Sequence, residues 1–262
     1  MEGFIPLRTL KRSLWNLVLP VMIVAVLAAT LLACNDDSEP VLLATEGDYH
    51  PFSFINDNGE IDGLERELGD ELCPRVELEC EWVLNDWESM IPDPVAGEFD
   101  AIIAGMSITD ERDMTVDFTE PYCPPTPSVY LAVAGAGDDA IQSKLGAYVN
   151  TIYSDYFKER GIAYIKFGDE DDRLAALLNG DIDAMLVDHV YAVDNLSEYE
   201  RQLTVVGPSV LLDRGIGIGV RNDNDLLAKL NSALASMKAD GALNELVHRW
   251  AGENAAMFFK AF

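Results

Sequence analysis

Basic residues are scarce in this chain of 262 residues. It has 18 Lys and Arg against 46 Asp and Glu, which gives a formal net charge of -28 at pH 7. A surface this acidic repels a phosphate backbone, which excludes nucleic acid as a natural partner. Two interpretations of the acidic excess stay open. It is either an adaptation to a salty habitat, spread over the whole surface, or a field that steers cationic solutes toward a cleft and weakens with added salt.

Histidine is rarer still. The chain has three, His50, His189 and His248, and none lies at a metal-ligand spacing from the four cysteines. The sequence also lacks internal repeats and low-complexity tracts. We therefore expect no metal site and no cofactor.

The N-terminus has the pattern of an export signal. Basic residues precede an apolar segment from Trp15 to Ala33, which ends in Leu-Leu-Ala-Cys and resembles a lipobox. We expect residues 1–33 to be a lipoprotein signal peptide, Cys34 to carry the lipid, and residues 34–40 to tether the domain to the membrane. An uncleaved membrane anchor is the alternative, since roughly 20 apolar residues can span a bilayer. Either interpretation places the domain outside the cytoplasm, in the periplasm or on the extracytoplasmic face.

Strand and helix patterns alternate almost throughout the rest of the chain, which predicts an α/β fold with a ligand at the strand ends. Short apolar runs predict strands at 41–45, 76–84, 101–104, 128–133, 145–149, 163–167, 184–187 and 203–206. Helices are predicted at 64–72, 89–96, 226–237 and 243–250. Pro92 and Pro94 interrupt the second helix, and the later proline is expected to break or kink it. A polar, Gly-rich segment at 134–140 marks a boundary, and residues 214–220 are expected to be the return crossing.

The segment from Asp100 to Tyr122, DAIIAGMSITDERDMTVDFTEPY, has the composition of a cleft floor. Ala104, Gly105 and Ser107 carry little bulk where a ligand would approach the backbone. Arg112 offers a planar fork of donors that suits a carboxylate. The alternative is a surface arginine paired with a neighbouring aspartate, Asp110 or Asp113.

GMSITDER followed by VDFTEPY resembles the signature of the bacterial extracellular solute-binding proteins that serve amino-acid ABC importers. The resemblance covers about residues 41–250 and includes TEGDYHPFSF, LLNGDIDAMLVDHVYA and MKADGALNELVHRW. It implies a periplasmic binding protein type II fold, with two Rossmann-like lobes joined by two hinge strands. The lobes would comprise residues 41–130 with 217–262, and residues 131–216. It also implies a monomer that closes like a Venus flytrap on its ligand and delivers it to a membrane permease.

The resemblance also implies how the α-groups of an amino acid are held. Arg112 and Ser107 would grip the α-carboxylate, and Thr151 would complete that site. Asn150 stands where relatives have Gly, and Asn tolerates a positive φ better than most residues. Asp188 would face the α-amino group, although a carboxylate at a strand end can instead cap the following helix.

The residues expected around the ligand side chain are Glu46, Tyr49, Trp87, Ala104 and Gly105. Together with the nearby Asp48 they give two acids and two aromatics, which suit a cation, so we expect a basic L-amino acid such as arginine, lysine or ornithine. Asp48 is expected to be solvated rather than in contact. Ala104 and Gly105 stand where some histidine-binding relatives have paired serines, and their residue types are closer to those of glutamine-binding relatives. A neutral polar ligand such as glutamine therefore stays an alternative.

Two further expectations concern the cysteines and catalysis. With Cys34 assigned to lipid, an oxidising compartment favours a disulfide between Cys73 and Cys80, as in relatives that bind basic amino acids, while Cys123 stays a buried thiol.

A cyclohexadienyl or prephenate dehydratase-like enzyme of the same fold is the rival function. It would need a general acid in the cleft, and nothing marks His189 or Glu46 as one, so we expect a binding protein and not an enzyme.

Overall fold

The first of two five-stranded sheets has the order β5-β1-β6-β13-β7, with β13 antiparallel to its neighbours. The computed structural model describes residues 39–222 and 225–252. The sheet comprises β1 (Val41–Thr45), β5 (Cys80–Leu84), β6 (Ala101–Ile102), β7 (Val116–Phe118) and β13 (Gly219–Arg221). The predicted leader 1–33, Cys34 and most of the tether 34–40 lie outside the described residues. Within the described residues no helix is both long and apolar enough to cross a membrane.

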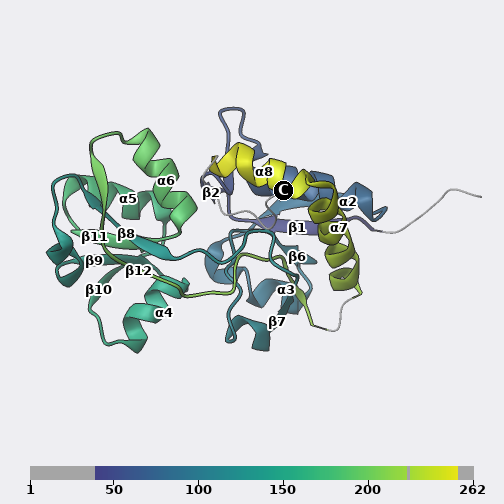
Figure 1. The fold of residues 1–262 in the computed structure, drawn as a ribbon. Helices are drawn as coiled ribbons and strands as arrows, with labels where there is room; N and C mark the ends of the chain where they lie inside the picture. The colour runs from purple at the N-terminus through teal and green to yellow at the C-terminus, as the bar shows by residue number, and fades with distance from the viewer. Residues whose placement is uncertain (1–38, 223–224, 253–262) are drawn as a thin grey trace, which may run out of the picture. The chain divides into compact units, whose positions relative to one another are not determined.

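Side chains that alternate along these strands build a core on each face of the first sheet. Leu43, Ala101 and Val220 pack on one face, against the helices α2 (Leu64–Arg75), α7 (Leu226–Asp240) and α8 (Ala242–Ala251) (Figure 1). Ala44 and Ile102 point to the other face and pack with Met90 and Phe99, which lie on either side of α3 (Pro92–Ala96) in the chain. The helix predicted at 89–96 is shorter than expected, because α3 begins only at Pro92. The helix tolerates both prolines because they lie in its first turn, where the backbone N–H groups have no intrahelical acceptor.

The second sheet has the order β10-β9-β11-β8-β12 and is also mixed. It comprises β8 (Ser128–Val133), β9 (Leu145–Tyr148), β10 (Tyr164–Phe167), β11 (Ala184–Val187) and β12 (Leu203–Val210). Helix α4 (Ile152–Glu159) packs on one face, and α5 (Glu170–Asn179) and α6 (His189–Glu198) pack on the other. This is the predicted α/β architecture.

Two segments connect the sheets. The chain leaves β7 through residues 119–127 and returns from β12 to β13 through residues 211–218. They are bridged where Cys123 lies beside Ile216, with Ile216 N donating to Cys123 O at 3.0 Å. The Cys123 thiol is free and buried, as expected.

The loop after β1 forms a small antiparallel sheet of β2 (Asp48–Tyr49), β3 (Ser53–Ile55) and β4 (Ile61–Asp62). Nearby, the predicted disulfide joins Cys73 at the end of α2 to Cys80 at the start of β5, with their Cα atoms 6.3 Å apart. The strand predicted from residue 76 begins only at Cys80, because α2 runs on to Arg75 and Glu77 takes a left-handed backbone with φ of 56°.

Candidate functional site

A cavity with about 50 Å³ of water-accessible space lies where ends of strands from both sheets converge. All nine predicted ligand residues line it, namely Glu46, Tyr49, Trp87, Ala104, Gly105, Ser107, Arg112, Thr151 and Asp188. Eight residues that were not predicted line it too: Thr45, Gly47, Ser53, Tyr148, Ile152, Tyr153, Glu170 and Arg173. The chain thus brings together residues up to 143 positions apart in sequence, from Thr45 to Asp188.

Arg112 is a buried cation without an acidic partner. Its side chain is 8% exposed, and Nη1 donates to Ser107 O at 2.9 Å while Nη2 donates to Asn150 O at 3.2 Å. Its Cζ lies 5.4 Å from the centroid of the Trp87 ring. No Asp or Glu of the described residues forms an ion pair with it, and burial lowers the pKa of Arg112. The surface alternative is wrong, because Asp110 and Asp113 pair with Arg214 instead.

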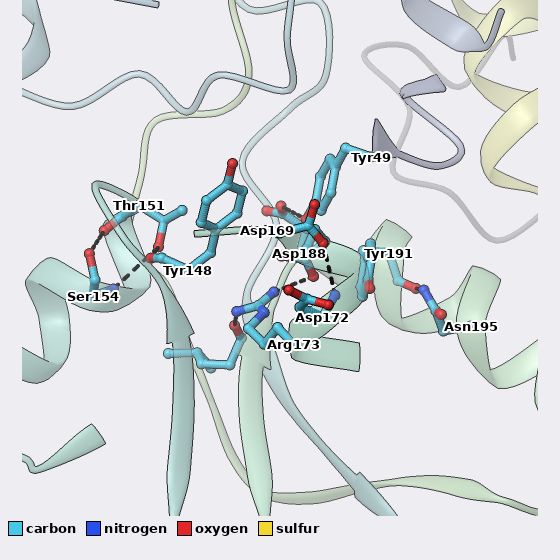
Figure 2. Close-up of polar contacts among 12 residues, drawn as sticks. Tyr49, Tyr148, Thr151, Ser154, Asp169, Asp172, Arg173, Asp188, Tyr191 and Asn195 are labelled. Atoms are coloured by element: carbon cyan, nitrogen blue, oxygen red, sulfur yellow. Dashed lines mark hydrogen bonds and ion pairs between the residues drawn. The ribbon is translucent and has the colours of Figure 1, made fainter. Parts of the chain in front are cut away.

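The backbone around Arg112 completes this end of the cavity. The Ser107 hydroxyl donates to Asp213 Oδ2 at 2.8 Å, on the returning segment. Asn150 takes the expected left-handed conformation, with φ of 58°. Thr151 then caps α4: its Oγ1 donates to Tyr148 O at 2.7 Å and accepts from Ser154 N at 3.3 Å (Figure 2). The N-terminus of a helix, with its partial positive charge, therefore begins beside the arginine.

Asp188 lies at the end of β11 and precedes α6 without capping it by a side-chain hydrogen bond. Tyr49 Oη donates to Asp188 Oδ2 at 2.6 Å, and Figure 2 shows this contact. The Tyr49 ring stacks on Tyr191, with centroids 4.9 Å apart. Burial raises the pKa of Asp188 to about 6, against the opposing effect of the tyrosine hydroxyls. A cation beside Asp188 would lower this pKa and stabilise the charged form.

Gly105 occupies a position that disfavours a side chain. Its φ is 59°, and a Cβ there would lie 3.2 Å from Cδ1 of Tyr49. Its N–H donates at 2.5 Å to Oε1 of Glu65, a fully buried carboxylate that also accepts from the Tyr122 hydroxyl. Burial raises the pKa of Glu65 to about 7.

Another part of the cavity wall is acidic. Tyr148 Oη donates to the Glu46 carboxylate, and the Trp87 ring lies 6.3 Å from the Tyr148 ring, centroid to centroid. Burial, and then the charge of Asp48, raise the pKa of Glu46 to about 8. Asp48 does not line this cavity. It lines a neighbouring hollow of about 570 Å³ with Glu46 and Asp169, and burial followed by the charge of Glu170 raises its pKa to about 6.

A buried ion pair completes the wall next to Tyr191. Arg173 Nη2 lies 2.5 Å from Glu170 Oε1, and their side chains are 1% and 2% exposed. Arg173 Nη1 also donates to Leu186 O at 3.3 Å. In the sequence these two lie in DEDDRL, which has the composition of a solvated helix start. The i,i+3 spacing of an acid and an arginine was the available signal.

The remaining unpredicted side chains follow from the fold. Tyr148 lies in a predicted strand and Tyr153 in the first turn of α4, but which face each presents depends on the packing of α4. Within residues 39–222 and 225–252, no three His, Cys, Asp or Glu side chains are arranged to hold a metal ion.

Comparisons with known proteins agree with this geometry. Residues 41–253 match the family model described as bacterial extracellular solute-binding proteins, family 3. A periplasmic His/Glu/Gln/Arg/opine family-binding protein from Silicibacter pomeroyi, solved in complex with lysine, is 48% identical with a TM-score of 0.79, over 83% of this chain and 100% of that one. The L-arginine-binding protein of Pseudomonas aeruginosa is 27% identical over 81% of this chain and 88% of its own length. The L-cystine-binding protein TcyJ of Escherichia coli is 30% identical over 81% and 82%. These relatives are binding proteins and not enzymes.

Proposed function

Because this chain belongs to the bacterial extracellular solute-binding proteins of family 3, we propose that it captures a basic L-amino acid and delivers it to the permease of an ABC importer. Amino-acid binding for import is the role shared by its relatives. The finer assignment, to arginine, lysine or ornithine, rests on the side chains of the cavity.

One observation carries the proposal: a buried guanidinium without a counter-ion and a buried carboxylate face the same cavity. Arg112 has no acidic partner among the described residues, and burial raises the pKa of Asp188. A zwitterion supplies a carboxylate for the first and an ammonium for the second. Each buried charge then gains the partner that compensates its desolvation.

The acidic part of the cavity wall favours a cationic side chain. Glu46 lies on the cavity wall between Trp87 and Tyr148, and Asp48 adds negative charge behind it. A ligand cation would lower the pKa of Glu46 and convert it to a carboxylate. The aromatic rings suit the aliphatic stem of lysine or the plane of arginine. The lysine complex of the Silicibacter pomeroyi protein is consistent with this choice.

A neutral polar ligand is the second candidate, and Glu46 also supports it. At pH 7 a carboxyl group with a pKa of about 8 is mostly protonated, so Glu46 could donate a hydrogen bond to an amide oxygen, as in glutamine. The charge of Asp48 behind Glu46 favours the cation.

We propose that each lobe contains one of the two sheets, with bending at the two connecting segments. Residues 128–130, expected in lobe 1, pair within the second sheet and so belong to lobe 2. Several contacts cross between these lobes: Tyr49 with Asp188, Tyr148 with Glu46, and Arg112 with Asn150. A ligand held by Arg112 and Asp188 adds a bridge between the same lobes. Binding therefore stabilises the closed form, which the permease recognises.

Export and membrane attachment are part of the proposal. We propose cleavage after Ala33 and lipidation of Cys34, with the following polar residues as the tether. Mass spectrometry of the membrane-extracted protein tests this. A lipid-modified N-terminal Cys34 supports the anchor, whereas an intact leader indicates an uncleaved membrane segment.

A thermal-melt panel tests the ligand assignment. The protein is freed of ligand by dialysis in denaturant, refolded, and scanned with each common amino acid, ornithine and agmatine. A ligand at ~100 times its dissociation constant adds roughly 2.7 kcal/mol, which raises the melting temperature by about 5–10 °C. We expect this shift with arginine, lysine or ornithine and none with agmatine, which lacks the carboxylate. A shift confined to neutral amino acids would refute the cationic assignment.

A further inference from the structure

A buried tyrosine on the cavity wall has a hydroxyl that makes no well-formed hydrogen bond within the described part of the chain. Tyr153 is 4% exposed and lines the cavity, and among the described residues its hydroxyl has no hydrogen-bond partner. Buried polar groups are normally paired, because an unpaired one carries the full cost of leaving water. The position of this hydroxyl therefore needs a reason beyond packing.

Local structure prevents Tyr153 from turning away. It is the second residue of α4, two positions after the cap at Thr151, where Ser154 Oγ donates to Thr151 O at 2.8 Å. Its ring is part of the core cluster that contains Phe157 and Leu186. The helix start and the core together hold the hydroxyl at the cavity.

The groups around this hydroxyl belong to the α end of the proposed ligand. Burial, and then the charge of Asp188, raise the pKa of Tyr153. Tyr153 in turn raises the pKa of Arg112, although burial is the larger cause and lowers it. One Asp188 oxygen already accepts from Tyr49. An ammonium group has three N–H donors, and the carboxylate of Asp188 alone does not satisfy them.

We infer that the Tyr153 hydroxyl is a further specificity-determining contact, which accepts a hydrogen bond from the ligand α-ammonium while its own proton is directed to Asp188. This inference rests on the proposed function, but only on its α-amino-acid part. It applies equally to lysine, arginine and glutamine, since they share that group. It also gives the site a reason to select a primary ammonium, which both Asp188 and Tyr153 contact.

The test compares Tyr153→Phe with wild type by calorimetry with L-lysine and by thermal melting without ligand. Tyr164→Phe on β10 removes a hydroxyl from the same lobe away from the cavity and is the matched control. We expect the dissociation constant of Tyr153→Phe to rise about tenfold or more, since a hydrogen bond to a charged group is lost. The melting temperature of the unliganded variant should fall no further than that of Tyr164→Phe, because the Tyr153 hydroxyl makes no well-formed hydrogen bond without ligand.

Two results would overturn the inference. One is a loss of affinity smaller than about fivefold. The other is a lower melting temperature of unliganded Tyr153→Phe than of Tyr164→Phe, which would assign the hydroxyl a structural role. If wild type does not bind lysine but binds glutamine, the cationic assignment fails, and the affinities of Tyr153→Phe and wild type are compared with glutamine instead. If wild type binds no amino acid at all, the proposed function and this inference fail together.

Discussion

Replacing Arg112 by Ala removes the group on which capture of the carboxylate depends. The side chain is buried, donates to Ser107 O and Asn150 O, and has no acidic partner among the described residues. With Ala, the ligand carboxylate enters the cavity without its ion-pair partner. Loss of one member of a buried, hydrogen-bonded charge pair costs about 2–5 kcal/mol, or roughly 30-fold to 5,000-fold in the dissociation constant.

Isothermal calorimetry with L-lysine measures this loss. Arg112→Lys keeps the charge but not the two-pronged donor, so its affinity should fall between those of wild type and Arg112→Ala. Arg214→Ala is the control, because this arginine is half-exposed and pairs with Asp113 at the surface. Its affinity should match wild type. An Arg112→Ala dissociation constant within about twofold of wild type would refute the assignment of Arg112.

Three other predictions use different parts of the chain. Glu46→Gln should weaken lysine binding by about tenfold or more and leave glutamine binding nearly unchanged, as measured by calorimetry; equal losses for both ligands would contradict a cation contact. Glu65 has a folded-state pKa of about 7, above its ordinary value of 4.5. As pH rises between these values, wild type should therefore lose stability relative to Glu65→Gln by up to about 1.4 kcal/mol per pH unit. Above pH 7 the difference should reach a plateau. Denaturant unfolding across this range checks the slope, and a constant difference between the two proteins would show that Glu65 titrates normally. Replacing Cys73 and Cys80 together by Ser should lower the free energy of unfolding by about 2–3 kcal/mol, the modest amount expected for a bond that closes a short loop. The affinity for lysine should stay within about twofold. A large loss of affinity would mean that the disulfide shapes the site.

The strands were predictable where burial on both faces leaves an uninterrupted apolar run. The predictions at 41–45, 128–133 and 184–187 match the structure at both ends. The prediction at 76–84 was wrong over its first four residues, since an alternating pattern does not reveal that Glu77 takes a left-handed turn. The weak helix near Pro92 was recognised, but its length depended on how the prolines fit the first turn.

The site was predictable where a motif specifies a backbone position. Asp188 directly follows β11, Arg112 lies in the motif that comes after β6, and both line the cavity. Tyr153, Glu170 and Arg173 were missed because their positions depend on which faces of α4 and α5 meet the cavity. A buried Glu170–Arg173 pair and a solvated charged helix start have the same local sequence, and only the packing distinguishes them.

A crystal structure of the protein with L-lysine tests the central claim most directly. The account predicts the α-carboxylate within hydrogen-bond distance of the Arg112 guanidinium, the α-ammonium on Asp188, and the side-chain ammonium directed to Glu46. A lysine bound in the reverse orientation, with its carboxylate away from Arg112, or bound outside this cavity, would contradict it.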